Sequence, residues 1–137
     1  MEIVLDTSAI IGLMDRDCKK HLLLKEIITD DRNLFIIPSP VIPEICYMLN
    51  KRFGVNIELL FLGEIIKNTF QMETLNYMDM LRAVEILGKY KDLNIGYVDA
   101  SIVAVSERLK MNKILTLDKK HFAAVAPKGF DSFDILI

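Results

Sequence analysis

The chain has 137 residues, of which 52% are hydrophobic and 26% charged. This length accommodates one domain, and the apolar content suffices for a hydrophobic core, which excludes a disordered chain. Seventeen Lys and Arg residues against nineteen Asp and Glu give a net charge of −2. That balance excludes a strongly basic nucleic-acid-binding coat and restricts polyanion binding to a local site. We predict a single domain over residues 1–137.

Targeting and redox signals are absent from the sequence. No apolar run approaches the roughly 18 residues of a membrane span. The first residues have neither a basic region nor a small-residue cleavage site, so no signal peptide is predicted. Cys18 and Cys46 lie in unrelated segments without Cys-x-x-Cys spacing, which predicts neither a zinc site nor a disulfide. We expect a cytoplasmic protein with no membrane association.

Strand and helix signals alternate along the first half of the chain. In order, they predict a strand at 2–5, a short helix through residue 13, a helix at 19–29, a strand at 34–37, a helix from Pro40 or Pro43 to 53, and a helix at 56–67. Thr7 and Ser8 supply N-cap chemistry for the first helix, and Asn56 for the last. Proline fits only the first turn of a helix, which places Pro43 at the start of its helix.

The second half continues the alternation. It predicts a strand at 70–72, an amphipathic helix through 80–90, a helix at 97–111, a strand at 113–117, a short helix at 119–124 and a strand near 132–136. Short apolar strands that alternate with helices imply a three-layer α/β fold with a parallel sheet.

Apolar faces distinguish three of these helices. Leu22, Leu23 and Ile27 are spaced for one face of the 19–29 helix. The amphipathic helix repeats apolar residues at helical spacing, namely at Met80, Ala83, Val84, Leu87 and Tyr90. The helix at 56–67 is apolar on more than one face, through Ile57, Leu59, Leu60, Phe61, Leu62, Ile65 and Ile66. That breadth indicates deep burial or a partner surface.

Acidic residues stand at the ends of two predicted strands and the starts of two predicted helices. Asp6 and Asp118 directly follow strands, and ligand sites gather at the carboxyl ends of parallel strands. Asp99 and Glu44 lie in the first turns of helices, where the helix dipole stabilises a carboxylate. Each position alone also suits an ordinary turn or cap residue.

Convergence of these four acids would have a chemical consequence. Carboxylates that share a pocket repel one another, which raises their pKa values unless a cation intervenes. Mg²⁺ and Mn²⁺ prefer oxygen ligands, and such an ion activates water and neutralises charge on a phosphodiester. The residues alone therefore lead to the hypothesis of an acidic metal site.

Four segments, read together, resemble the four motifs of PIN-domain ribonucleases. They are Ile3–Ile11, Val41–Ile45, Tyr97–Ala104 and Leu115–Phe122. Their order and spacing and the total length match, so the resemblance spans essentially the whole chain. It implies a PIN-like α/β/α fold with a central parallel sheet, and a metal-dependent endoribonuclease that hydrolyses RNA.

The resemblance also implies roles for individual residues. Asp6, Glu44, Asp99 and Asp118 would form the catalytic quartet around Mg²⁺ or Mn²⁺. Asp6, Asp99 and Asp118 would hold the metal directly or through waters, whereas Glu44 would complete the charge or orient the attacking water.

Further positions match the family pattern in part. Ser8 matches a position that often carries a hydroxyl or amide supporting the quartet, and Phe122 matches an apolar core residue. Ser101 stands near where some relatives carry another acid, which leaves the number of metals open. Many small members are toxins of toxin–antitoxin modules, so the resemblance implies a small antitoxin partner and a homodimer, for which residues 57–66 offer an apolar face.

Other classes of protein fit less well. Haloacid-dehalogenase phosphatases need a second aspartate where this chain has Ser8, and receiver domains need a phosphoacceptor where Pro38 follows the strand. A PIN-like scaffold that binds RNA or protein with little or no cleavage remains the alternative. We assign no catalytic role to His21, an ordinary helix-face residue, or to His121, which is near Asp118 but lacks a paired His or Cys.

Positive charge for phosphate contacts is sparse. Lys119 and Lys120 directly follow Asp118 and are the best-placed candidates. Lys51 with Arg52, and Arg108 with Lys110, are the other candidate pairs.

Overall fold

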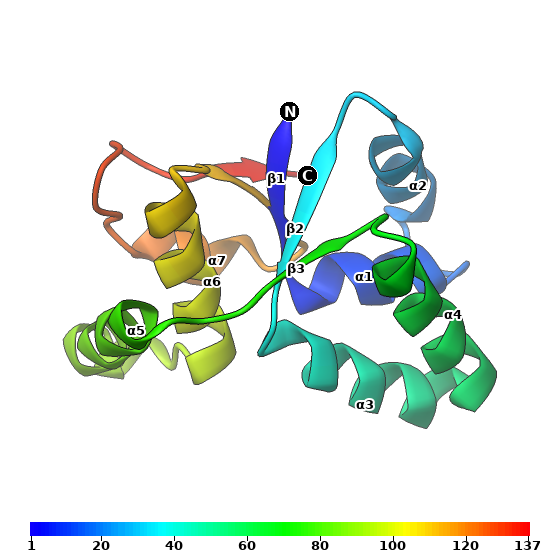
Figure 1. The fold of residues 1–137 in the computed structure, drawn as a ribbon, viewed down its shortest axis with the longest axis horizontal. Helices are drawn as coiled ribbons and strands as arrows, with labels where there is room; N and C mark the ends of the chain where they lie inside the picture. The colour runs from blue at the N-terminus through cyan, green and yellow to red at the C-terminus, as the bar shows by residue number, and fades with distance from the viewer.

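A five-stranded, all-parallel sheet lies at the centre of the computed structural model, which describes residues 1–137. The strands are β1 (Glu2–Leu5), β2 (Leu34–Pro38), β3 (Gln71–Glu73), β4 (Lys113–Leu115) and β5 (Asp134–Leu136). One face of the sheet is covered by α1 (Thr7–Met14), α2 (His21–Thr29), α3 (Val41–Phe53) and α4 (Val55–Ile66) (Figure 1). The other face is covered by α5 (Tyr77–Lys89), α6 (Tyr97–Leu109) and α7 (Lys119–Ala124), with a short 3₁₀ helix at Lys91–Leu93. The predicted three-layer α/β fold is confirmed.

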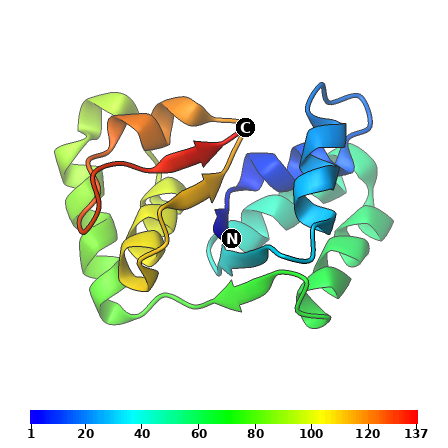
Figure 2. The same ribbon diagram turned by 90° about the horizontal axis from the view of Figure 1, so that it is seen from above.

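The strand order is β3-β2-β1-β4-β5. From β1 the chain adds β2 and then β3 on one side, and it later adds β4 and then β5 on the other side of β1. Val4 pairs with Ile36 on one side, and Leu5 pairs with Leu115 on the other. Figure 2 shows β4 and β5 side by side at one end of the sheet, away from β3. Because connections leave β1 and β4 toward opposite faces, a crevice opens at the carboxyl ends of these two strands.

The central strand is fully buried. Ile3, Val4 and Leu5 have no exposed surface, as expected for a parallel strand covered by helices on both faces. Burying each such side chain contributes about 1.5–3 kcal/mol. Phe122 of α7 is only 1% exposed, which confirms its predicted place in the core. The elements that flank the crevice are therefore held by one continuous core.

Two predicted helix caps are wrong. Asp6, rather than Thr7 or Ser8, caps α1, because its carboxylate accepts a hydrogen bond from the Thr7 backbone N–H at 2.7 Å. Asn56 lies inside α4, whose N-cap is Gly54. With φ of 92°, Gly54 adopts the left-handed region that favours glycine, so α3 ends and α4 begins at this one residue.

The observed bounds differ from the predicted ones at several ends. β3 begins at Gln71, β5 at Asp134 and α2 at His21, while α6 ends at Leu109 and β4 at Leu115. Lys110 takes a left-handed conformation and closes α6. The early end of β4 matters for the site, because Thr116 and Leu117 separate the strand from Asp118.

Several side chains of the predicted apolar faces are exposed. In α2, Leu22 is 78% exposed, whereas Leu24 is buried. In α5, Val84 is 61% exposed, and the side turned inward carries Asp79, Ala83 and Ile86. In α4 only Phe61 is fully buried, and the exposed apolar side chains are Val55, Leu59, Leu60 and Ile66. None of the helices combines the length and apolar character needed to cross a membrane.

Candidate active site

A cleft of about 230 Å³ opens at the carboxyl edge of the sheet. All four predicted acids line it, together with neighbours from α1, α3 and α7; the lining residues are Asp6, Thr7, Ser8, Glu44, Met48, Asp99, Asp118 and His121. The structure therefore brings together every acid that the sequence analysis singled out.

The topology explains this convergence. Asp6 follows β1, and Asp118 follows β4 after two intervening residues. Glu44 lies in the first turn of α3, which starts just beyond the end of β2. Asp99 lies in the first turn of α6, which must begin at the carboxyl edge because it returns the chain to the start of β4. Both helix N-termini direct their positive dipole ends toward the cleft.

Asp6 is the most firmly held of the four carboxylates. It is 5% exposed. Its Oδ1 accepts the Thr7 N–H, and its Oδ2 accepts hydrogen bonds from Thr116 Oγ1 at 2.6 Å and from Ser8 Oγ at 3.1 Å. These three donors fix the orientation of the carboxylate.

Two hydroxyls join the ends of β1 and β4. Ser8 Oγ accepts the Leu117 N–H at 2.8 Å, and Thr116 Oγ1 accepts the Asp118 N–H at 2.9 Å. The two hydroxyl oxygens lie 3.0 Å apart. Ser8 thus stands where a supporting hydroxyl was expected. The sequence analysis missed Thr116, although a threonine two residues before a candidate acid was a usable signal.

His121 is the second residue that the sequence analysis missed. Its Nδ1 lies 2.8 Å from Asp99 Oδ2 and 3.3 Å from Asp118 Oδ2. We gave this histidine no role because it lacked a paired His or Cys, yet its partners in the structure are carboxylates. Its place three residues after Asp118, on one side of α7, was the available signal.

The carboxyl groups of the cleft disfavour one another's charge. Burial raises the pKa of Asp6, and the charge of Asp118 adds to this rise against the opposing hydrogen bonds. Burial also raises the pKa of Asp99, with a further contribution from Asp6 that the neighbouring His121 opposes. The pKa of Glu44 is raised by burial and by the charges of Asp6 and Asp99. A cation in the cleft would relieve this repulsion.

The donor set fits a hard divalent cation. The four acids supply only oxygen ligands, the kind that Mg²⁺ and Mn²⁺ prefer. Thr7 Oγ1 lines the same cleft and is buried without a hydrogen bond of regular geometry, although it lies close enough to Glu44 to oppose the rise of its pKa. As the side chains lie, no three His, Cys, Asp or Glu form a metal-binding group. The carboxylates would therefore turn toward a cation that binds there.

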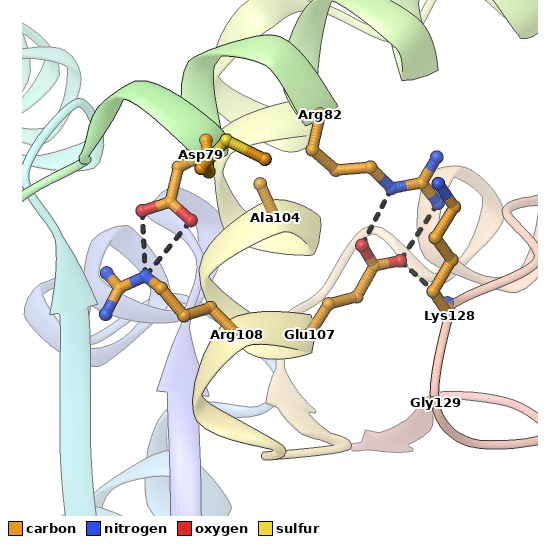
Figure 3. Close-up of a pocket in the computed structure, with 8 residues that line it drawn as sticks. Asp79, Arg82, Ala104, Glu107, Arg108, Lys128 and Gly129 are labelled. Atoms are coloured by element: carbon orange, nitrogen blue, oxygen red, sulfur yellow. Dashed lines mark hydrogen bonds and ion pairs between the residues drawn. The ribbon is translucent and has the colours of Figure 1, made fainter.

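A larger cavity of about 400 Å³ lies between α5, α6 and Lys128. Its two arginines are paired with acids (Figure 3), and Lys128 pairs with Glu85 outside the cavity lining. Arg82 binds Glu107 at 2.7 Å, and Arg108 binds Asp79 at 3.0 Å. Because every charge that lines it has a partner, we identify the smaller acidic cleft as the candidate active site.

Ion pairs also hold two of the other candidates for phosphate contacts. Arg108 forms ion pairs with Glu73 on β3 and with Asp79 on α5, so its guanidinium stabilises the fold. Arg52 is likewise paired with Asp15. Lys119 and Lys120, by contrast, are exposed in the first turn of α7.

Comparison with known proteins agrees with this fold. The family model described as PIN domain matches residues 3–128, and the chain belongs to this family. The chain is 30% identical to Ribonuclease VapC26 of Mycobacterium tuberculosis (strain ATCC 25618 / H37Rv) over 134 residues, which cover 98% of this chain and 99% of the relative.

Solved structures show the same fold. The toxin VapC20 of Mycobacterium tuberculosis, which cleaves the sarcin-ricin loop, superposes with a TM-score of 0.81 at 20% identity, covering 89% of this chain and 94% of that one. VapBC2 from Rickettsia felis, bound to a DNA fragment from its promoter, superposes with a TM-score of 0.71 at 16% identity and complete coverage of both chains.

Proposed function

We propose that this protein is a metal-dependent endoribonuclease and the toxin of a toxin–antitoxin pair, with the acidic cleft as its active site. The observation that carries the proposal is the convergence of four acids at the positions of the PIN motifs. Identity of 30% to a VapC ribonuclease over nearly the full length of both chains supports cleavage of RNA.

Each acid has a defined part in this proposal. Asp6, Asp99 and Asp118 hold Mg²⁺ or Mn²⁺ directly or through waters, and Glu44 completes the charge or orients the attacking water. When bound, the cation lowers the pKa of a water and neutralises charge that develops on the phosphodiester. The hydroxyls of Ser8 and Thr116 keep Asp6 in one orientation throughout.

Substrate binding depends on few cations, given the net charge of −2. Lys119 and Lys120 follow Asp118 directly and are exposed, so they are positioned to contact phosphates beside the cleft. Because such contacts are few, we expect weak nonspecific RNA binding that falls as the salt concentration rises.

Metal removal tests the activity. We expect the purified protein to cleave mixed RNA in the presence of Mn²⁺, to lose cleavage in excess EDTA, and to regain it when Mn²⁺ is restored in excess. Gel electrophoresis of the RNA after each step measures the outcome. Cleavage that persists in EDTA would contradict the mechanism, and binding of RNA or protein without any cleavage would favour the scaffold alternative.

Two protein partners are proposed, both in the cytoplasm. One is a small antitoxin, by analogy with a toxin–antitoxin complex from Klebsiella pneumoniae that has a similar fold. The other is a second copy of this chain. Two exposed apolar surfaces are available, one on α4 around Leu59 and Leu60 and one on α5 around Met78 and Val84.

Charge substitutions identify the surface between the copies. We expect the wild-type protein to be a dimer by light scattering at about 50 μM, a concentration well above the Kd of a stable dimer. Leu60 and Val84 are 59% and 61% exposed, so Leu60→Asp and Val84→Asp leave the core intact. We expect one of the two variants to be monomeric and the other to stay dimeric as its matched control. A monomeric wild type would contradict the dimer.

A further inference from the structure

His121 connects two acids of the cleft that no other side chain holds. It lies on α7, and the residue that follows it, Phe122, is buried in the core with 1% exposure. Its own side chain is 30% exposed and lines the cleft. The Nδ1 atom lies 2.8 Å from Asp99 Oδ2 and 3.3 Å from Asp118 Oδ2. A carboxylate only accepts hydrogen bonds, so a hydrogen on Nδ1 would face both acids.

The two acids differ from Asp6 in what else holds them. The Asp6 carboxylate has three donors, from Thr7, Ser8 and Thr116. Among the basic side chains, only His121 lies within ion-pair distance of the carboxylates of Asp99 and Asp118. They also come from separate elements, since Asp99 lies on α6 and Asp118 lies between β4 and α7. One imidazole thus orients two acids that the backbone does not tie together.

The contact uses one oxygen of each acid and leaves the other free. His121 binds Oδ2 of both Asp99 and Asp118, and the Oδ1 atoms make no hydrogen bond within the protein. Groups that orient metal-ligating side chains in this way typically change metal affinity or activity by about 10- to 100-fold when they are removed.

We propose that His121 is a positioning residue of the metal site, which holds Asp99 and Asp118 by one oxygen each and presents their Oδ1 atoms to the cation. This inference rests on the proposed function, because it concerns the same cleft. It differs from a role in which His121 contacts RNA, which would act through Nε2 and leave metal affinity unchanged.

Direct measurement of Mn²⁺ binding by electron paramagnetic resonance tests the role without relying on activity. His121→Leu removes the N–H, whereas His121→Asn retains an N–H donor near the position of Nδ1. We expect the Kd for Mn²⁺ to rise about 10- to 100-fold in His121→Leu and to stay within a few-fold of wild type in His121→Asn. Circular dichroism confirms that each variant is folded. His21→Leu serves as the matched control, because His21 is the second histidine of the chain and does not line the cleft. This variant should bind Mn²⁺ like wild type.

Cleavage assays over a range of Mn²⁺ concentrations give a second readout. We expect His121→Leu to need more Mn²⁺ for half-maximal activity and to approach the wild-type kcat once the metal is saturating. Unchanged Mn²⁺ affinity with a lowered kcat would overturn the proposal in favour of a contact to RNA. Equal loss of affinity in His121→Leu and His121→Asn would also overturn it, because the N–H would then not be the feature that matters.

The two proposals fail in different ways. If wild type binds no Mn²⁺, the metal-dependent function itself fails, and this inference with it. If wild type binds Mn²⁺ and Asp6→Asn weakens that binding while His121→Leu does not, only the role of His121 is refuted.

Discussion

Asp6→Asn is expected to lower the rate of RNA cleavage by at least about 100-fold, because a ligand of the cation should matter no less than the groups that orient ligands. Asn is nearly the same size and is an equally good N-cap, so the Thr7 N–H keeps its acceptor. The change removes negative charge from the cleft and replaces Oδ2 with an amide group, to which the hydroxyls of Ser8 and Thr116 can no longer donate. Initial rates with saturating Mn²⁺ measure the effect, and a rate within a few-fold of wild type would remove Asp6 from the mechanism.

Thermal unfolding across pH provides the control for folding of Asp6→Asn. Burial raises the pKa of Asp6 in the folded state above its ordinary value of 3.8. The folded protein then binds this proton more tightly than the unfolded chain does, so the ionised carboxylate destabilises the metal-free fold at higher pH. That destabilisation fades as the pH falls through the raised folded pKa toward 3.8. We expect the metal-free variant to be at least as stable as wild type at pH 8, with a smaller difference near pH 4.

Asp79→Ala is expected to cost about 3–4 kcal/mol in the free energy of unfolding. Asp79 is 3% exposed and binds Arg108 Nε through both carboxylate oxygens at 3.0 Å. It also completes the capping box of α5, where its Oδ2 accepts the Asn76 N–H at 3.1 Å. Breaking a buried ion pair from one side typically costs about 3–5 kcal/mol, and loss of a cap about 1 kcal/mol. The partial exposure of Arg108, 29% for its side chain, argues for the lower part of that range.

Denaturant unfolding of Asp79→Ala measures this cost. Asp92→Ala is the matched control, because Asp92 is exposed and makes no hydrogen bond or ion pair through its side chain. We expect the control to stay within about 0.5 kcal/mol of wild type. Asp79→Asn keeps an acceptor for the cap but loses the charge and should fall between the two. If Asp79→Ala is as stable as the control, the prediction is wrong, and solvation of Arg108 compensates for the lost ion pair.

The fold was largely predictable because it depends on local patterns. Short apolar strands that alternate with helical spacing define a parallel α/β sheet, and each predicted strand is present. Errors arose where one residue replaced an expected cap. Asp6 caps α1 in place of Thr7 or Ser8, and Gly54 separates α3 from α4 in place of a cap at Asn56.

Contacts across the fold were beyond the reach of these patterns. Val84 belongs to the predicted apolar face of α5, but the side that packs inward carries Asp79, Ala83 and Ile86, and Asp79 pairs with Arg108 of α6. The only local signal at Thr116 and His121 was their nearness to Asp118, which does not reveal what their side chains contact. Their importance comes from Asp6 and Asp99, which are far away in sequence and reach them only through the sheet.

The sequence by itself determined which acids to examine, since strand ends and first helical turns are local features that residue type and spacing reveal. It also determined the parallel arrangement that sends the ends of all strands to one edge. Only the tertiary structure decided that Asp6, Glu44, Asp99 and Asp118 share one cleft, and that Ser8, Thr116 and His121 hold three of them. The physical reason is that hydrogen bonds and burial depend on distances in space, which the adjacency of β1 and β4 sets and the order of residues along the chain does not.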